Sequence, residues 1–144
     1  MRPDAAEPYL RFLTTLTPAG VGQLDRYCTP DVHFRDPFHD TVGIEAYRRV
    51  LIAMYEAMEI EEFAVMAPAY RDAECHVEWT LRYRFRNALL PREPATIPGA
   101  SRLRLTADGL VAEHTDYWDG GAIYERTPGV GVLVRALKRR IAAG

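Results

Sequence analysis

The chain is predicted to fold as one α+β domain, in which a few helices precede a curved, mostly antiparallel sheet. Apolar residues recur at helical spacing in Glu7–Leu16 and Gly43–Met58, whereas from Cys75 onward they occupy alternate positions, as in strands. An Asp-Gly turn near the end of the chain joins two of the alternating segments. The length of 144 residues fits a single domain, and 48% hydrophobic residues are enough to form a core.

The N-terminal part of the chain is predicted to be mainly helical. Residues Glu7–Leu16 place their apolar side chains on one helical face, and a second short helix is expected to reach Cys28. Val32–Asp36 alternates with period two, which predicts a short strand. Gly43–Met58 has the clearest apolar stripe of a helix, made of Ile44, Tyr47, Val50, Leu51, Met54 and Met58.

The second half of the chain is predicted to form the sheet. Cys75–Phe85 alternates apolar with charged or polar residues, so it predicts a long strand with one buried and one solvated face. A proline-containing connection over Pro91–Pro98 leads to a strand at Ser101–Thr106. The turn Ala107–Gly109 accepts the positive φ angles of a tight hairpin, and the last strand follows at Leu110–Trp118.

Charge and cysteine content exclude several classes of protein. Four basic residues lie in the last ten positions, and the rest of the chain has 14 basic against 20 acidic residues, a charge of −6 that argues against nucleic-acid binding. Cys28 and Cys75 do not make a disulfide framework and are expected to be reduced. Because the chain lacks an apolar run of ~20 residues and its first residues do not resemble a secretory signal, we expect a cytoplasmic protein.

Two predicted strands end in acidic residues after an apolar beginning. On the last strand His114, Asp116 and Trp118 continue a face that starts with apolar side chains, and on the first strand Asp36 follows Phe34 on one face. Burying such groups without partners would cost several kcal/mol. They are therefore paired, bound to a metal, or exposed to a wet cavity, and a cone-shaped pocket with a polar end explains both strands.

Each of these residues has a structural alternative. Asp36 precedes a proline and can instead hold the turn before the next helix, while Asp116 and His114 can form an internal hydrogen-bonded pair. The three together have the chemistry of metal ligands, but their spacing gives no further support for a metal site. His39 is expected outside the pocket, and Trp79 in the core or in the cavity wall.

The order of elements resembles the nuclear transport factor 2-like superfamily, which includes SnoaL-like proteins and ketosteroid isomerase. The likeness covers residues 7–119 and depends on Phe34–Pro37, on the helix that opens with Gly43-Ile44, and on His114–Asp119. It implies a cone-shaped α+β barrel with N-terminal helices packed on a strongly curved sheet. Residues 1–128 would form this domain, and residues 129–144 would add a basic amphipathic helix.

The resemblance also implies roles for individual residues. In ketosteroid isomerase the aspartate matching Asp36 is the general base, and a tyrosine matching Tyr9 hydrogen-bonds the developing enolate. Ser101 stands where that enzyme has a protonated aspartate, which argues against ketosteroid isomerisation itself. SnoaL-like cyclases instead use an aspartate on the last strand, and Asp116, with His114 two residues earlier, fits that position.

The predicted function is acid–base chemistry on an apolar, carbonyl-bearing ligand: enolisation, isomerisation or cyclisation. Asp36 or Asp116 would be the base, His114 and Tyr9 would polarise the carbonyl, and no organic cofactor or metal is implied. The residues expected to contact the ligand are Trp118, Trp79, Phe34, Tyr55, Tyr83 and Ser101. The alternative is a binder or carrier of a lipid-like molecule without turnover.

Two surfaces predict further partners. The outer sheet face is expected to form a homodimer through the mixed charges of Arg82, Arg84, Arg102, Arg104, Glu78 and Glu113. The predicted C-terminal helix, Val130–Ala142, has an apolar seam flanked by basic residues. It either docks on the body or on a partner, or makes weak contact with an anionic membrane surface.

Overall fold

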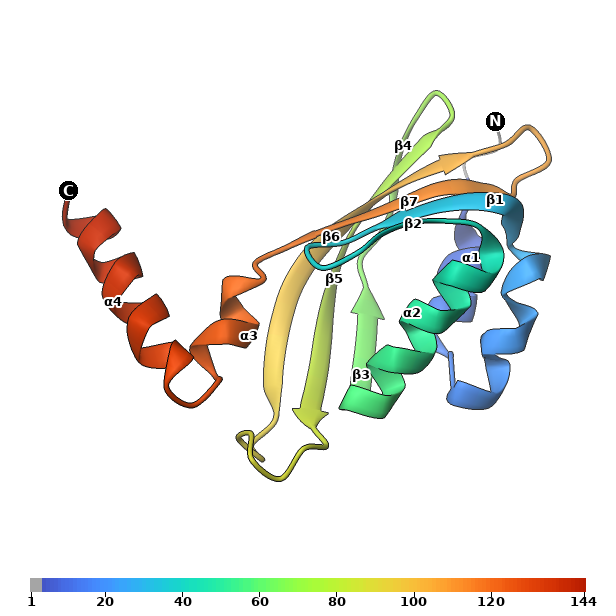
Figure 1. Cartoon of the computed structure of the whole chain (residues 1–144). Helices are drawn as coiled ribbons and strands as arrows, with labels where there is room; N and C mark the ends of the chain where they lie inside the picture. Colours follow the sequence, from blue (N-terminus) through green and yellow to red (C-terminus); the bar gives the residue numbers. More distant parts are fainter. Residues whose placement is uncertain (1–3) are drawn as a thin grey trace.

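A strongly bent sheet surrounds the N-terminal helices in the computed structural model, which describes residues 4–144 (Figure 1). The helices are α1 (Glu7–Thr14), the 3-10 helix η1 (Pro18–Arg26), α2 (Ile44–Ala57), α3 (Gly121–Glu125) and α4 (Val130–Ala143). The first three lie against the concave face of the sheet, and α3 and α4 follow the last strand. The predicted α+β class is confirmed.

The sheet has the strand order β2-β1-β7-β6-β5-β3, and β4 pairs with β5 beside this path. Its strands are β1 (Cys28–Arg35), β2 (Asp40–Val42), β3 (Met58–Val65), β4 (Ala69–Arg71), β5 (Glu74–Phe85), β6 (Ala95–Leu105) and β7 (Val111–Trp118). Only β1 and β7 run parallel; the other pairs are antiparallel. The ends of β1 and β7 therefore meet at one side of the sheet, which places the two acidic strand ends near each other.

Several boundaries differ from the sequence prediction. The expected helix up to Cys28 is a 3-10 helix that ends earlier, because Cys28 already pairs with Val111 as the first residue of β1. The predicted connection over Pro91–Pro98 is wrong in its second half, where β6 already pairs with β5. Pro98 is tolerated there because β7 joins β6 only from Gly99 onward, so the proline lies on a free edge.

Two parts of the core fill the two ends of the sheet. The larger part packs α1, η1 and α2 against β1, β5, β6 and β7, with fully buried side chains such as Leu24, Val32 and Leu103. The smaller part, around Tyr83 and Phe85, lies at the far end of β5. In the described chain both cysteines are free and buried, as predicted. Burial raises the pKa of the Cys28 thiol to about 12.

The outer face of the sheet carries the predicted mixed charges, but these charges pair within the chain. Glu61 accepts hydrogen bonds from Arg82 at 2.8 Å and from Arg84 at 2.7 Å, and Glu113 accepts one from Arg104 at 2.9 Å. These Arg–Glu contacts hold adjacent strands together, and the homodimer through this face stays a prediction. Within residues 4–144, no helix is both long enough and apolar enough to cross a bilayer.

Candidate functional site

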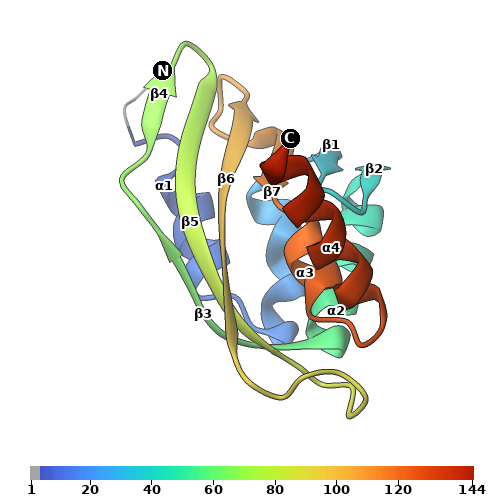
Figure 2. The same cartoon turned by 90° about the vertical axis from the view of Figure 1, so that its left-hand side faces the viewer.

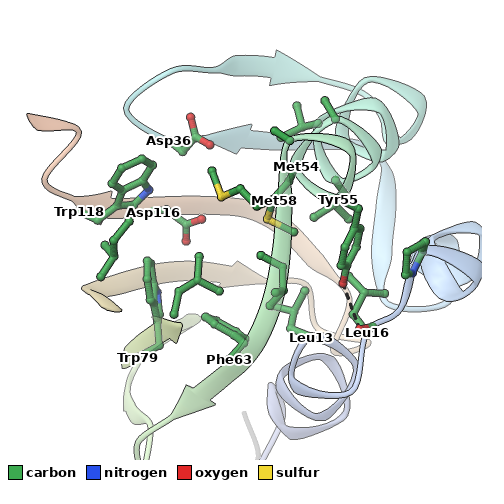
Figure 3. A pocket seen from close by; sticks show the side chains of 18 of the residues that line it. Leu13, Leu16, Asp36, Met54, Tyr55, Met58, Phe63, Trp79, Asp116 and Trp118 are labelled. Atoms are coloured by element: carbon green, nitrogen blue, oxygen red, sulfur yellow. Dashed lines mark hydrogen bonds between the residues drawn. The ribbon is translucent and has the colours of Figure 1, made fainter. Parts of the chain in front are cut away.

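A cavity of about 600 Å³ lies between the helices and the concave face of the sheet. Most of its wall is apolar and comes from α1, α2, β3, β5 and β7, and the carboxylates of Asp36 and Asp116 lie at the ends of β1 and β7 (Figure 3). Other charged residues of the lining, Glu59, Glu61, Glu62 and Arg86, lie on β3 and after β5. Residues that form the apolar wall include Leu13, Leu51, Met54, Met58, Phe63, Trp79, Leu81 and Ile97. The volume suits a small organic molecule.

Strand β7 presents three of the predicted site residues to this cavity. His114, Asp116 and Trp118 alternate along β7, so they share the concave face, and all three line the cavity. The pairing with β6 places Ser101 opposite Asp116, and the parallel pairing with β1 places Phe34 beside His114. The predicted gradient is present on β1, where Phe34 and Asp36 both line the cavity. On β7 the apolar side chains expected at the start of the face, Leu110 and Ala112, are absent from the lining, because a register shift between β6 and β7 buries Val111 instead.

The carboxylate of Asp116 is held by two side chains on the same oxygen. His114 Nε2 lies 2.6 Å from Asp116 Oδ1, and Ser101 Oγ donates to that oxygen at 2.5 Å. Trp79 Nε1 donates in turn to Ser101 Oγ at 2.8 Å. No protein group among residues 4–144 hydrogen-bonds Asp116 Oδ2, and Figure 3 shows this side chain pointing into the cavity.

Two buried tyrosines complete the hydrogen-bond chain on the other side of His114. Tyr9 Oη lies 2.7 Å from His114 Nδ1 and 2.6 Å from Tyr47 Oη, and Tyr47 Oη is 3.3 Å from the same nitrogen. Burial raises the pKa of both phenols well above 10, so both stay protonated and able to donate. In this hydrogen-bond network, an imidazole that accepts from Tyr9 at Nδ1 and donates to Asp116 from Nε2 uses both ring nitrogens of His114.

Asp36 also lines the cavity, but its carboxylate is occupied by its own turn. Its Oδ1 accepts hydrogen bonds from the backbone N–H groups of Phe38 and His39, each at 2.7 Å, and lies 2.9 Å from His39 Nδ1. Asp36 therefore holds the turn that follows β1, which is the structural alternative that the sequence offered for this residue. His39 lines the cavity too, so the expectation that it lies outside is wrong, because the turn folds its ring back onto Asp36.

The remaining predicted residues fall into three positions. Trp118, Trp79, Phe34 and Tyr55 line the cavity, as expected, and Tyr55 Oη donates to the carbonyl of Leu16 at 3.0 Å. Tyr9 and Ser101 lie behind the wall and reach the cavity only through His114 and Asp116.

Tyr83 is outside the cavity lining, since its position on β5 points it into the smaller core. Its ring packs at 5.2 Å from that of Phe85, and the Arg126 guanidinium lies 5.6 Å from the Tyr83 ring centre. Tyr83 is therefore a packing residue rather than a ligand contact.

Tyr47 is a site residue that the sequence analysis placed only in the apolar stripe of its helix. It is fully buried, lines the cavity and stacks on Phe34 at 4.3 Å. A tyrosine at the centre of an apolar stripe needs a partner for its hydroxyl, and that requirement was the available signal. Within residues 4–144, no three histidine, cysteine or acidic side chains are arranged to hold a metal ion.

A family model for the SnoaL-like domain matches residues 9–114. The chain belongs to this family. No curated protein matches it. The solved structures that resemble it include a candidate SnoaL-like polyketide cyclase from Jannaschia sp. CCS1, with a TM-score of 0.71, 18% identity, and coverage of 88% of this chain and 92% of that chain.

Two further structures show the same architecture. A protein with a ketosteroid isomerase-like fold from Catenulispora acidiphila, in complex with trimethylamine, has a TM-score of 0.70 and 15% identity over 88% of this chain and 94% of its own. TsrD from Streptomyces laurentii has a TM-score of 0.71 and 15% identity over 88% and 96%, respectively. The predicted nuclear transport factor 2-like fold is confirmed, and at these identities the likeness concerns the fold alone.

Proposed function

We propose that this SnoaL-like protein binds an apolar, carbonyl-bearing small molecule and that Asp116 is the general base acting on it. One observation supports this proposal most directly. Asp116 Oδ1 is held by His114 and Ser101, while Oδ2 faces a mostly apolar cavity without a protein partner in the described chain. A carboxylate oriented in this way can accept a proton from a ligand carbon while its own geometry stays constant.

The reaction begins when Asp116 Oδ2 takes a proton from the carbon next to the ligand carbonyl. The electron pair of that C–H bond moves into the enolate, and the negative charge moves from the carboxylate to the enolate oxygen. Return of the proton to a different carbon completes an isomerisation. In a cyclisation, the enolate carbon instead attacks a second carbonyl carbon of the same ligand, the π electrons of that carbonyl move onto its oxygen, and the alkoxide takes the proton from Asp116.

Trp118 is the donor we assign to the enolate oxygen. It lies beside Asp36 and Asp116 at the polar end of the cavity (Figure 3). Among residues 4–144, no acceptor is hydrogen-bonded to its Nε1, in contrast to the Nε1 of Trp79, which is used by Ser101. An N–H group that is free before the ligand binds can stabilise charge as it develops.

His114 and Tyr9 act as positioning residues in this mechanism. Both nitrogens of His114 are engaged, one with Asp116 and the other with Tyr9, so the ring orients the base instead of contacting the carbonyl. Of the two predicted bases we assign Asp116, because the turn at Phe38 and His39 already uses the Asp36 carboxylate.

The test uses the bicyclic ketone β-tetralone, whose acidic C–H bonds exchange in deuterium oxide. Proton NMR should show binding and an exchange rate above that in buffer, lost in Asp116→Asn and kept in Asp36→Asn. Binding without exchange would support the carrier alternative and remove Asp116 as a base. Native mass spectrometry of the purified protein would detect a lipid-like molecule retained from the cell, and no binding of either kind would overturn the proposal.

A further inference from the structure

Helix α4 exposes an apolar stripe that the rest of the described chain does not cover. Leu133, Leu137 and Ile141 are 72%, 59% and 71% exposed, and Val130 is 44% exposed. These four residues follow each other at helical spacing, so they form one continuous stripe. Figure 1 shows α4 at the end of the molecule, projecting beyond α3 and away from the body of the sheet, and Figure 2 looks onto this end, with α4 in front.

The polar side of α4 faces the body. Gly131 is buried against the end of α3, where an added Cβ would lie 2.2 Å from the carbonyl oxygen of Glu125. Arg135 donates to the same carbonyl at 2.7 Å, and Lys138 Nζ lies 3.1 Å from carboxylate oxygens of both Asp119 and Glu125. A docked amphipathic helix normally turns its apolar face inward. In α4 the ion pairs orient the helix so that the apolar stripe faces outward.

The charge of this segment is one-sided. Residues 130–144 contain Arg135, Lys138, Arg139 and Arg140 and no acidic residue. Arg139 and Arg140 are exposed and make no hydrogen bond or ion pair with residues 4–144. On a helical projection Arg140 lies on one edge of the stripe and Lys138 on the other. Long basic side chains in these positions can keep their charges in a polar headgroup layer while the stripe enters the apolar layer.

We propose that α4 docks on an anionic phospholipid surface, with the stripe of Val130, Leu133, Leu137 and Ile141 in the acyl region and Arg140 on the headgroups, while Arg139, on the side opposite the stripe, adds to the positive charge of the tail. Its 14 residues span about 21 Å, enough to lie flat on a bilayer but not to cross it. The rest of the chain carries a charge of −6 and is repelled by such a surface, so attachment is confined to the tail.

Among residues 4–144, the apolar surface with which a second copy could match the stripe is its own α4 stripe, and pairing the two would bring together two basic tails that contain no acidic residue. Outside α4, the exposed large apolar side chains of the described chain lie on several elements and form no comparable row; they include Val42, Ile52, Met66, Leu89 and Tyr117. A fluid lipid surface needs no such complementary shape. The proposal is independent of the chemistry proposed for the cavity, because it uses no cavity residue.

Co-sedimentation of the full chain with vesicles tests this proposal. Binding is expected to vesicles of phosphatidylcholine with phosphatidylglycerol and not to pure phosphatidylcholine, and salt should weaken it. Leu133→Glu combined with Leu137→Glu should abolish binding. Arg140→Gln should weaken it roughly fivefold, and Arg139→Gln, on the side of the helix opposite the stripe, should weaken it less. Leu89→Glu makes the same chemical change at a loop residue that is 82% exposed, and it should leave binding unchanged.

Equal binding of Leu133→Glu/Leu137→Glu and the unaltered protein would overturn the proposal, as would the absence of binding to anionic vesicles. Circular dichroism of each variant confirms that it is folded. Analytical ultracentrifugation supplies the other decisive result. A dimer mass that falls to the monomer mass in Leu133→Glu/Leu137→Glu, together with no vesicle binding, would assign the stripe to a second copy instead.

Discussion

Asp36 and Asp116 are the same residue type at the ends of two neighbouring parallel strands, and they differ in what holds them. The groups around the Asp36 carboxylate come from the next three residues of the chain. The groups around Asp116 come from distant segments: Ser101 on β6 directly, and Tyr9 on α1 through His114. A carboxylate bound locally maintains a turn, whereas one held by distant side chains is available to a ligand. Four predictions test this contrast.

The largest effect is expected for the proposed base. Asp116→Asn should lower the rate of deuterium exchange into β-tetralone by about 10²–10⁴-fold, the usual contribution of a general base. Asp36→Asn should leave the rate close to that of the unaltered protein, since Asp36 is assigned to the turn. The measurement is the loss over time of the NMR signal of the protons on the carbons next to the ketone. The reverse pattern would make Asp36 the base and would overturn our reading of the contrast.

A second prediction concerns the packing of Gly99 against Trp79, the indole that hydrogen-bonds Ser101 next to Asp116. An added Cβ at Gly99 would lie 2.4 Å from the Trp79 ring, so Gly99→Ala must move the indole that donates to Ser101. The free energy of unfolding should fall by about 1–3 kcal/mol, as measured by urea denaturation. Gly22→Ala is the matched control, because nothing lies within 4 Å of its added Cβ. Similar losses in both variants would contradict the assigned role of Gly99.

The local turn should have a smaller effect on stability. Asp36→Ala removes the acceptor for two backbone N–H groups and should cost about 1–2 kcal/mol of unfolding free energy. Asp36→Asn keeps an acceptor oxygen and should lose less. Urea denaturation of the two variants provides the comparison. An equal loss in both would mean that the negative charge matters more than the turn hydrogen bonds.

The smallest effect is expected at alkaline pH. Burial raises the pKa of Tyr9 and Tyr47 above 10.0, so the folded protein keeps protons that the unfolded chain releases. Stability should therefore be independent of these groups below about pH 9 and decrease as pH rises through 10, by about 0.4 kcal/mol for each tyrosine at pH 10.

Tyr47→Phe provides the control for the pH prediction. It removes one of the two raised phenols, so the decrease in stability above pH 10 should become shallower than in the unaltered protein. Urea denaturation across this pH range measures both proteins. An unchanged slope would show that Tyr47 does not contribute to the pH dependence of stability.

Much of the architecture was predictable from local patterns. The stripe of α2 and the alternation of β5 and β7 are strong signals because each side chain's burial follows directly from helical or strand geometry. Strand β3 was missed because its burial pattern does not alternate regularly, and its pairing with β5 defines it as a strand. The strand at Ala95–Pro98 was missed for a different reason: its proline indicated a connection, and the pairing with β5 overrides that signal.

The candidate site was predictable only in part. Alternation placed His114, Asp116 and Trp118 on one face, and the structure keeps them there. Alternation shows which face of a strand a residue lies on but not whether that part of the strand borders the cavity. For that reason Tyr83 was expected in the cavity, although it belongs to the smaller core. The contribution of Tyr47 depends on contacts across 67 residues of chain to His114, which no local pattern contains.

The sequence by itself determined the fold class, the family and the strand face that carries His114 and Asp116, because periodicity and motif are properties of neighbouring residues. Only the tertiary structure decided which carboxylate is held by its own turn and that the apolar stripe of α4 faces outward. Those outcomes depend on which side chains hydrogen-bond the Asp116 carboxylate and which acidic groups form ion pairs with Lys138. A hydrogen bond between distant segments is fixed by how helices and strands pack, and that arrangement is a property of the whole chain.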